Sequence, residues 1–396
     1  MNSFDRELTK RLAALRAQGL HRELRRADSP PGSRLHTGGR TLLNFSSNDY
    51  LGLADDPLLK QAAIRAVEKF GAGSGASRLI CGSLAPHHEL EEALADFKGT
   101  EAALSFSTGY ATALGAICAL LGKGDIIVLD KLVHASIVDA ARLSGAKIRV
   151  FAHNDPDDLE KILKWTGDKS PLTPRASRVL VVTESIFSMD GDAAPLSEIV
   201  ALKEKYAAWL MVDEAHATGL YGKNRRGRAE ELGVSGQIEI QMGTLGKAAG
   251  AAGGYICGSR PLVDYLVNRA RSFIFSTAPV PAAAAAATAG IRLIQSPGGE
   301  RRRKSLWTRV EELKAKFKRQ NSKSSGAIIP IMTGDENKAV EAALALREQG
   351  IFVPAIRYPA VARNQARLRV TLTAAHTAGE INRLAAALNE IVNRKP

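Results

Sequence analysis

Short apolar runs alternate with longer amphipathic segments along most of the chain. Helical patterns cover residues 57–70, 86–97 and 108–121. Strands buried on both faces and separated by helices are typical of a mostly parallel sheet. We therefore expect a large α/β domain over residues 46–296. Its predicted strands are 104–106, 126–129, 148–151, 179–183, 209–212 and 238–242.

The pattern changes near residue 300, where a basic helical segment (300–321) begins. It is followed by short apolar runs at 328–332, 351–356 and 367–372 and by helical patterns at 336–349 and 377–393. This order predicts a small α+β domain over residues 297–396. Residues 1–45 hold a charged helix and a short strand at 41–45. Such a helix is not stable alone, so we expect it to pack near the C-terminal domain.

The composition is that of an ordinary globular protein. Of 396 residues, 45% are hydrophobic and 24% charged, which excludes a disordered tail, a collagen and a disulfide scaffold. Three widely spaced cysteines indicate reduced thiols and a cytoplasmic protein. The apolar stretch 278–294 is rich in alanine and interrupted by Pro281, so it predicts a buried helix and no membrane span.

The formal charge of +13 is concentrated in two segments. Residues 1–40 hold nine basic and four acidic residues, and residues 301–323 hold ten basic and two acidic residues. Three interpretations remain open at this point: nucleic-acid binding, a pair of solvated helices, or attraction of a phosphorylated or acidic partner.

Polar side chains follow several of the predicted strands. In open α/β sheets, ligands bind at the carboxyl ends of the strands. Acids, histidines, hydroxyls and one lysine occur there, which predicts the rim of an active site. The segments are 130–134, 184–190, 213–216 and 243–247.

Two of these segments allow more than one interpretation. Asp213 and His216 could cap a strand end or bind a metal, but their spacing lacks the i,i+4 geometry of a zinc site, so no metal is expected. Lys247 lies among glycines and alanines. It is either a solvated lysine or an amine held neutral by an apolar pocket and able to form a Schiff base.

Two glycine-containing runs are candidate phosphate sites. The run at 71–78 follows a helix instead of a strand, so it is not a dinucleotide fingerprint. The segment 107–116 opens a helix with small residues. Its N-terminus could bind an anion, although any capped helix has this pattern.

Taken together, the ordered motifs resemble those of the α-oxoamine synthases, a branch of the fold-type I pyridoxal-5′-phosphate (PLP) enzymes. The resemblance covers nearly the whole chain and implies a large PLP-binding domain with an aspartate aminotransferase-like fold. The motifs are SSNDYLGL, GAGSGASRLICG, HHELEEALADF, FSTGYAT, DKLVHASIVDAARLS, VVTESIFSMDGD, WLMVDEAHATGLYG, GTLGKAAGAAGGY, RSFIFSTA and ARLRVTLTAAHT.

The resemblance also implies a role for individual residues. Lys247 would carry PLP and remove the Cα proton of the amino acid, and Asp213 would pair with the pyridine nitrogen. His134 would stack on the ring, with Ser188 and His216 at its O3′ oxygen. The phosphate would be bound by Gly109, Tyr110 and Thr244, and by Ser276 and Thr277 of the other subunit of an obligate homodimer.

The substrate contacts implied by the resemblance lie near both ends of the chain. Asn48 and His134 would lie at the amino acid, Arg357 would bind its carboxylate, and Arg22 would contact the acyl group. Ala360 stands where the family often has threonine, so no hydroxyl contact to substrate is expected there.

The resemblance is greatest to members that join L-alanine to a pimeloyl thioester of coenzyme A or acyl carrier protein, with loss of CO2. Alternatives within the family act on glycine and acetyl-CoA or on other amino acids.

A DNA-binding regulator with a PLP-enzyme fold is disfavoured because no helix-turn-helix module precedes the motifs. A catalytically inactive homologue is disfavoured because Lys247, Asp213 and His134 are all present. The basic segments are then expected to attract the phosphates of coenzyme A or an acidic carrier protein.

Overall fold

The computed structural model describes residues 1–167, 178–317, 324 and 326–393. The chain divides into two compact units. The larger unit is Asn48–Ser305, and the smaller unit combines Met1–Ser47 with Leu306–Pro396. The N-terminal helix thus belongs to the same unit as the C-terminal segment, and the division falls inside α12 (Pro297–Lys316).

A seven-stranded sheet forms the centre of the larger unit. Its strands run in the order β3-β9-β8-β7-β6-β4-β5. The five strands from β8 to β5 are parallel, while β9 runs antiparallel to both of its neighbours. The bounds are β3 (Ala102–Phe106), β4 (Ile126–Asp130), β5 (Lys147–Phe151), β6 (Val179–Glu184), β7 (Trp209–Asp213), β8 (Ile240–Thr244) and β9 (Gly254–Gly258).

Helices precede, connect and follow these strands along the chain. They are α2 (Pro57–Phe70), α3 (Ala85–Lys98), α4 (Gly109–Leu120), α5 (Ala135–Ser144), α6 (Pro156–Gly167), α7 (Leu196–Lys205), α8 (Arg228–Glu231), η1 (Ser235–Gln237), α9 (Arg260–Arg269), α10 (Arg271–Ile274) and α11 (Pro281–Gln295). Local signals set their ends, as in α2, where the Asp56 side chain accepts a hydrogen bond from the Leu58 N–H and Gly71 ends the helix with a φ of 81°.

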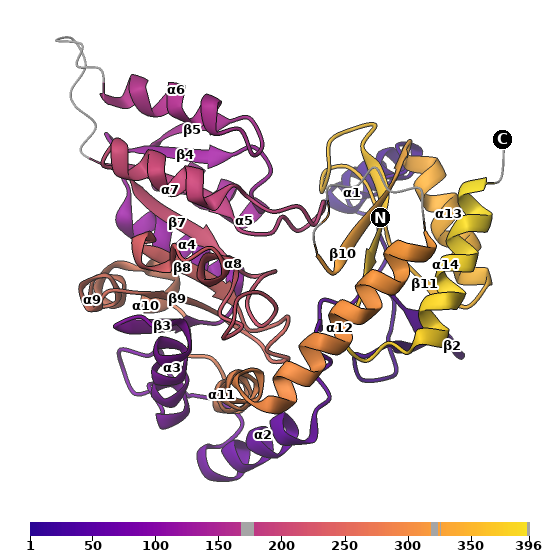
Figure 1. Cartoon of the computed structure of the whole chain (residues 1–396), viewed down its shortest axis with the longest axis horizontal. Coiled ribbons are helices and arrows are strands. Elements are labelled where there is room, and N and C mark those ends of the chain that lie inside the picture. The colour runs from indigo at the N-terminus through magenta and orange to yellow at the C-terminus, as the bar shows by residue number, and fades with distance from the viewer. Residues whose placement is uncertain (168–177, 318–323, 325, 394–396) are drawn as a thin grey trace. The chain divides into compact units, whose positions relative to one another are not determined.

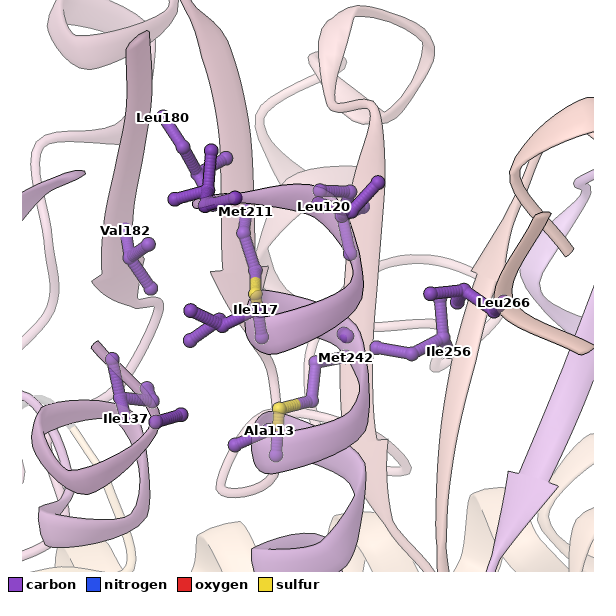
Figure 2. Close-up of a cluster of buried hydrophobic side chains, with 14 of the residues drawn as sticks. Ala113, Ile117, Leu120, Ile137, Leu180, Val182, Met211, Met242, Ile256 and Leu266 are labelled. Carbon is purple, nitrogen blue, oxygen red and sulfur yellow. The ribbon is translucent and has the colours of Figure 1, made fainter. Parts of the chain in front are cut away.

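Two apolar clusters hold helices against the sheet. In one cluster, α4 is the central helix, and Ile117 and Ala113 face Val182, Met211 and Met242 of the strands (Figure 2). The other cluster joins α6 and α7, which lie side by side in Figure 1, to β4, β6 and β7. Burial of both sheet faces explains why these strands are continuous apolar runs in the sequence.

The smaller unit contains two three-stranded sheets, ordered β1-β2-β11 and β10-β13-β12. Within the described residues, no helix of either unit is long and apolar enough to cross a membrane. The remaining elements are α1 (Ser3–Ala17), β1 (Arg34–Thr37), β2 (Arg40–Asn44), β10 (Ile328–Gly334), α13 (Glu336–Glu348), β11 (Ile351–Phe352), β12 (Ala355–Ile356), β13 (Ala366–Thr371) and α14 (Ala378–Asn393).

The predicted strands of the large domain correspond to β3 to β8, with ends that differ by at most two residues. No strand was predicted at β9, whose segment contains and follows several glycines and therefore lacks a continuous apolar run. The predicted helix 300–321 begins earlier, at Pro297, and its last residues, 318–321, lie outside the described residues.

Candidate active site

The four strand ends singled out in the sequence belong to neighbouring strands. The strands β8, β7, β6 and β4 are adjacent in the sheet and mutually parallel, so their carboxyl ends lie at one edge. Lys247, Asp213, Glu184 and His134 all follow or end these strands. The edge therefore collects an amine, two carboxylates and an imidazole in one place.

Lys247 lies at a buried histidine. Its Nζ is 2.9 Å from Nε2 of His216, and Nδ1 of the same ring is 2.6 Å from the Tyr50 hydroxyl oxygen. Both His216 and Tyr50 are buried, whereas Lys247 is half-buried. The histidine thus has a fixed ring orientation, and its partners lie far from it in the sequence.

Asp213 and Glu184 are register partners at the ends of β7 and β6. Burial raises the pKa of Asp213, and the nearby charges of Lys247 and His134 and an N–H donated by Ala215 oppose this increase. Burial and then the charge of Asp213 raise the pKa of Glu184 well above its ordinary value. Two adjacent buried carboxyls do not ionise together easily, so the amine of Lys247 is the electrostatic counterpart of this pair.

His134 caps the N-terminus of α5 while its ring remains accessible to solvent. Its Nδ1 lies 2.8 Å from the Ser136 hydroxyl oxygen and accepts a hydrogen bond from the Ser136 N–H. Desolvation by the surrounding protein lowers the pKa of His134, and the positive charge of Lys247 acts in the same direction, while Asp213 opposes both. The ring is therefore anchored at one nitrogen, with its open side available for stacking.

The N-terminus of α4 forms a narrow site of small residues. A Cβ atom on Gly254 would lie 2.8 Å from the Gly109 Cα and 2.4 Å from the Thr112 hydroxyl oxygen, so glycine is required for this approach. Thr244 packs beside Gly109, and its hydroxyl accepts the Gly246 N–H. The first N–H groups of a helix, Gly109 and Tyr110 here, have no partner within the helix and attract anions.

The other predicted residues of the larger unit are Asn48, Ser188, Ser276 and Thr277. Ser188 is in the segment after β6, and its backbone N–H donates to Glu184. Asn48 is linked to His216 through Tyr50, whose hydroxyl lies 3.5 Å from the Asn48 side-chain oxygen and also contacts the His216 ring. Ser276 and Thr277 follow α10, and Thr277 pairs with Ser77 in an isolated β-bridge.

The remaining predicted residues lie together in the smaller unit. The guanidinium of Arg357 donates to the Gly19 carbonyl and to the His21 carbonyl. Arg22 donates to the Tyr358 carbonyl at 3.2 Å, and the Ala360 N–H closes a turn onto the Arg357 carbonyl. The turn after α1 is thus joined to the segment 357–360 inside this unit.

Tyr50 and Glu184 were not predicted as site residues, although they lie in the motifs SSNDYLGL and VVTESIFSMDGD. Their roles depend on contacts across the sheet edge, which local sequence does not reveal.

The expectation for the basic helix also changes. Arg302 is held by Asp56 and the Leu51 and Gly52 carbonyls, and Arg303 by Glu300. These two charges are therefore engaged in contacts within the protein.

The residues present fit PLP by their chemistry. The site offers a primary amine on Lys247, a buried carboxylate on Asp213 for a ring nitrogen, and a glycine-lined helix N-terminus for a phosphate. An unpartnered buried oxygen, Glu184 Oε1, lies at the same edge of the sheet. This donor set matches an aldehyde cofactor with a basic ring and an anionic tail.

Comparison with known proteins agrees with this chemistry. Residues 40–388 match the family Aminotransferase class I and II. The chain is 46% identical to an 8-amino-7-oxononanoate synthase of Geotalea daltonii, covering 99% of this chain and 98% of that protein. It is 43% identical to the enzyme of the same name from Thermoanaerobacter pseudethanolicus, covering 97% and 96%.

Solved structures give the same result for the fold. The serine palmitoyltransferase of S. paucimobilis, with a bound PLP-myriocin aldimine, superposes with a TM-score of 0.90 at 31% identity, covering 99% of this chain and 98% of that chain. An 8-amino-7-oxononanoate synthase of Francisella tularensis gives 0.75 at 28% identity, covering 89% and 98%. The chain belongs to the aminotransferase class I and II family, in its α-oxoamine synthase branch, and has the fold-type I architecture.

Proposed function

We propose that the chain is a PLP-dependent acyltransferase that condenses L-alanine with a pimeloyl thioester, giving 8-amino-7-oxononanoate, CO2 and the free thiol. This is a step of biotin biosynthesis. The observation that carries the proposal is the contact of Lys247 with His216 beside the buried Asp213. Full-length relatives at 43–46% identity that bear the name of this activity support it.

The cofactor site uses the residues of the sheet edge. Lys247 would bind PLP covalently through Nζ, the Asp213 carboxylate would accept a hydrogen bond from the protonated pyridine nitrogen, and His134 would cover the ring face. Ser188 and His216 would hydrogen-bond the ring oxygen. The phosphate would be bound by the Gly109 and Tyr110 N–H groups and the Thr244 hydroxyl. When bound, PLP supplies an electron-withdrawing ring that stabilises negative charge at the α-carbon of an amino acid.

The chain's own residues position the substrates and move protons. Lys247 Nζ removes the Cα proton of alanine and returns a proton to that carbon at the end. His216, held by Tyr50, orients the amine. Between the two proton transfers, a bond forms from Cα to the acyl carbon, the C–S bond breaks with the thiol leaving, and the original carboxylate leaves as CO2.

The substrate contacts and the partner subunit complete the proposed site. Arg357 binds the carboxylate of alanine through its guanidinium, Asn48 lies at the amino acid, and Arg22 contacts the acyl chain. Ala360 offers no hydroxyl to the substrate. The active sites lie at the interface of a homodimer, where Ser276 and Thr277 reach the phosphate of the partner subunit. We place the reaction in the cytoplasm, with Cys81, Cys118 and Cys257 as free thiols.

Thiol release tests the substrate assignment. The protein loaded with PLP is mixed with alanine, glycine or serine, each with pimeloyl-CoA or acetyl-CoA, and free thiol is measured. We expect release with alanine and pimeloyl-CoA at the highest kcat/KM. Preferred release with glycine and acetyl-CoA would instead assign a glycine C-acetyltransferase. The Lys247→Ala variant is expected to lose the visible absorbance of covalently bound PLP.

A further inference from the structure

The segment 151–155 (FAHND), which begins with the last residue of β5, contains a histidine that lies between two carboxylates. His153 follows β5, and its Nδ1 lies 2.9 Å from Asp130 Oδ1 while its Nε2 lies 2.8 Å from Asp192 Oδ2. The Phe187 and His153 rings pack edge to face, with 4.4 Å between their centroids. Only a protonated imidazole can donate from both nitrogens. We call Asp130, His153 and Asp192 the histidine clamp.

The clamp joins segments that follow different strands. Asp130 ends β4, and its second carboxylate oxygen accepts the Asn154 N–H. Asp192 lies after β6 and accepts a further hydrogen bond from the Asn154 side chain. Both carboxylates are buried. The ends of β4, β5 and β6 are therefore joined by one residue pair, His153 and Asn154.

Each of the two joined segments carries a residue of the candidate active site. His134 lies four residues after Asp130, and Ser188 lies four residues before Asp192. The Glu184 carboxylate, at the same edge of the sheet, accepts the backbone N–H groups of both His134 and Ser188. Displacement of either clamped segment would thus move a group that faces the cofactor.

We propose that His153 is a positioning residue for the condensation reaction: as a doubly hydrogen-bonded cation, it fixes the segments that present His134 and Ser188 to PLP. This inference rests on the proposed function for the identity of the site. The residues of the histidine clamp are not among those proposed to contact the substrates. We therefore expect the clamp to affect turnover and the orientation of bound PLP.

The electrostatic setting of His153 supports the cationic form. Burial lowers the pKa of His153, but hydrogen bonds to Asp130 and Asp192 and their charges outweigh this effect and raise it to about 9. Asp158 and Asp155, the neighbouring acids, accept the backbone N–H groups of Ala152 and Asp158. His153 is therefore protonated at neutral pH, and it loses one of its two N–H donors as the pH rises through about 9.

The first test measures the titration of His153 without substrates. Deuterium exchange at the imidazole C2–H, followed by mass spectrometry, reports its protonation in the cofactor-free protein. We expect a midpoint near pH 9 in the parent protein. In Asp192→Asn, which removes one charge at nearly constant volume, the midpoint falls by about one unit or more. A parent midpoint near the ordinary value of histidine would overturn the proposal.

The second test links that titration to the site. The alkaline midpoints of kcat and of the visible circular dichroism of bound PLP should shift in Asp192→Asn in the same direction as the His153 midpoint. His153→Gln, which can bind one carboxylate only, should lower kcat about tenfold at neutral pH, with the thioester KM nearly unchanged. The matched control His36→Gln, at an exposed histidine, should resemble the parent.

Together, the two tests distinguish a failure of the proposal for the histidine clamp from a failure of the proposed function. If Asp192→Asn shifts the His153 midpoint while kcat and the dichroism keep the parent profile, the clamp has a structural role alone and the proposal is wrong. If no substrate pair is turned over, the proposed function fails, and the dichroism still decides whether the clamp sets the cofactor. If His153→Gln does not fold, Asp192→Asn decides the outcome.

Discussion

The hydroxyl oxygen of Tyr50 lies 2.6 Å from Nδ1 of His216, on the opposite side of the ring from Lys247. Tyr50 comes from the segment that precedes α2, and His216 follows β7. The contact is buried, so the hydrogen bond is not shared with bulk water. It therefore fixes which nitrogen of His216 faces the amine.

Removing this hydroxyl should weaken both catalysis and folding. In Tyr50→Phe, the ring volume remains and His216 loses one buried partner, which costs about 1–3 kcal/mol. We expect kcat for thiol release to fall about tenfold or more, with a small decrease in melting temperature. Tyr206→Phe is the matched control, because its hydroxyl bonds Glu160 away from the sheet edge. Equal effects of the two variants would contradict a role for Tyr50.

Asp213→Asn should affect turnover far more than substrate binding. The change keeps the side-chain volume but removes the charge that the protein sets against Lys247 and His134. A residue that stabilises charge mainly in the transition state affects kcat, and we expect a loss on the order of 100-fold. Steady-state kinetics with alanine and pimeloyl-CoA measure it. Asp157→Asn, at an exposed position of α6, is the control, and unchanged turnover in Asp213→Asn would refute the assignment.

Arg302→Ala should destabilise the larger unit. The Arg302 guanidinium bonds the Leu51 and Gly52 carbonyls and pairs with Asp56, which caps α2. Loss of these contacts leaves a buried carboxylate without its cation, at a cost of about 1–3 kcal/mol. Thermal unfolding should show a melting temperature lower by a few degrees, with Arg301→Ala, at an exposed neighbour, near the parent value. If the thioester KM rises instead and stability is unchanged, Arg302 serves to attract the acyl donor.

The smaller unit should lose stability in mild acid through His376. This buried ring stacks on Phe45, accepts the Thr373 N–H and bonds the Asn44 carbonyl. Burial lowers the pKa of His376 to about 4. Because the unfolded chain binds the proton at higher pH than the folded chain, stability is complete above about pH 6.5 and declines as the pH falls toward 4. Between pH 7 and 5 the loss is about 2 kcal/mol.

Chemical denaturation at several pH values measures this loss. His376→Gln, which cannot titrate, should show a smaller dependence on pH over the same interval, although its stability at pH 7 is lower. His88→Gln, at an exposed position, should keep the parent slope. A parent slope in His376→Gln would assign the acid sensitivity to other groups.

The sequence predicted the larger sheet well because its strands are buried on both faces and therefore appear as continuous apolar runs. β9 was missed because glycines in and before it allow a close approach to α4, a reason visible only in three dimensions. The adjacency of Glu184 and Asp213 depends on strand register, and the joining of β4, β5 and β6 by His153 depends on sheet order. Neither relationship can be inferred from the spacing of residues.

Product analysis with labelled alanine tests the proposed reaction most directly. The PLP-loaded protein is incubated with pimeloyl-CoA and alanine carrying ¹³C in its carboxyl group, and the products are identified by mass spectrometry. We predict unlabelled 8-amino-7-oxononanoate, with labelled CO2 and free coenzyme A released in equal amounts. Thiol release without labelled CO2, or a product that retains the label, would contradict a decarboxylative condensation on this chain.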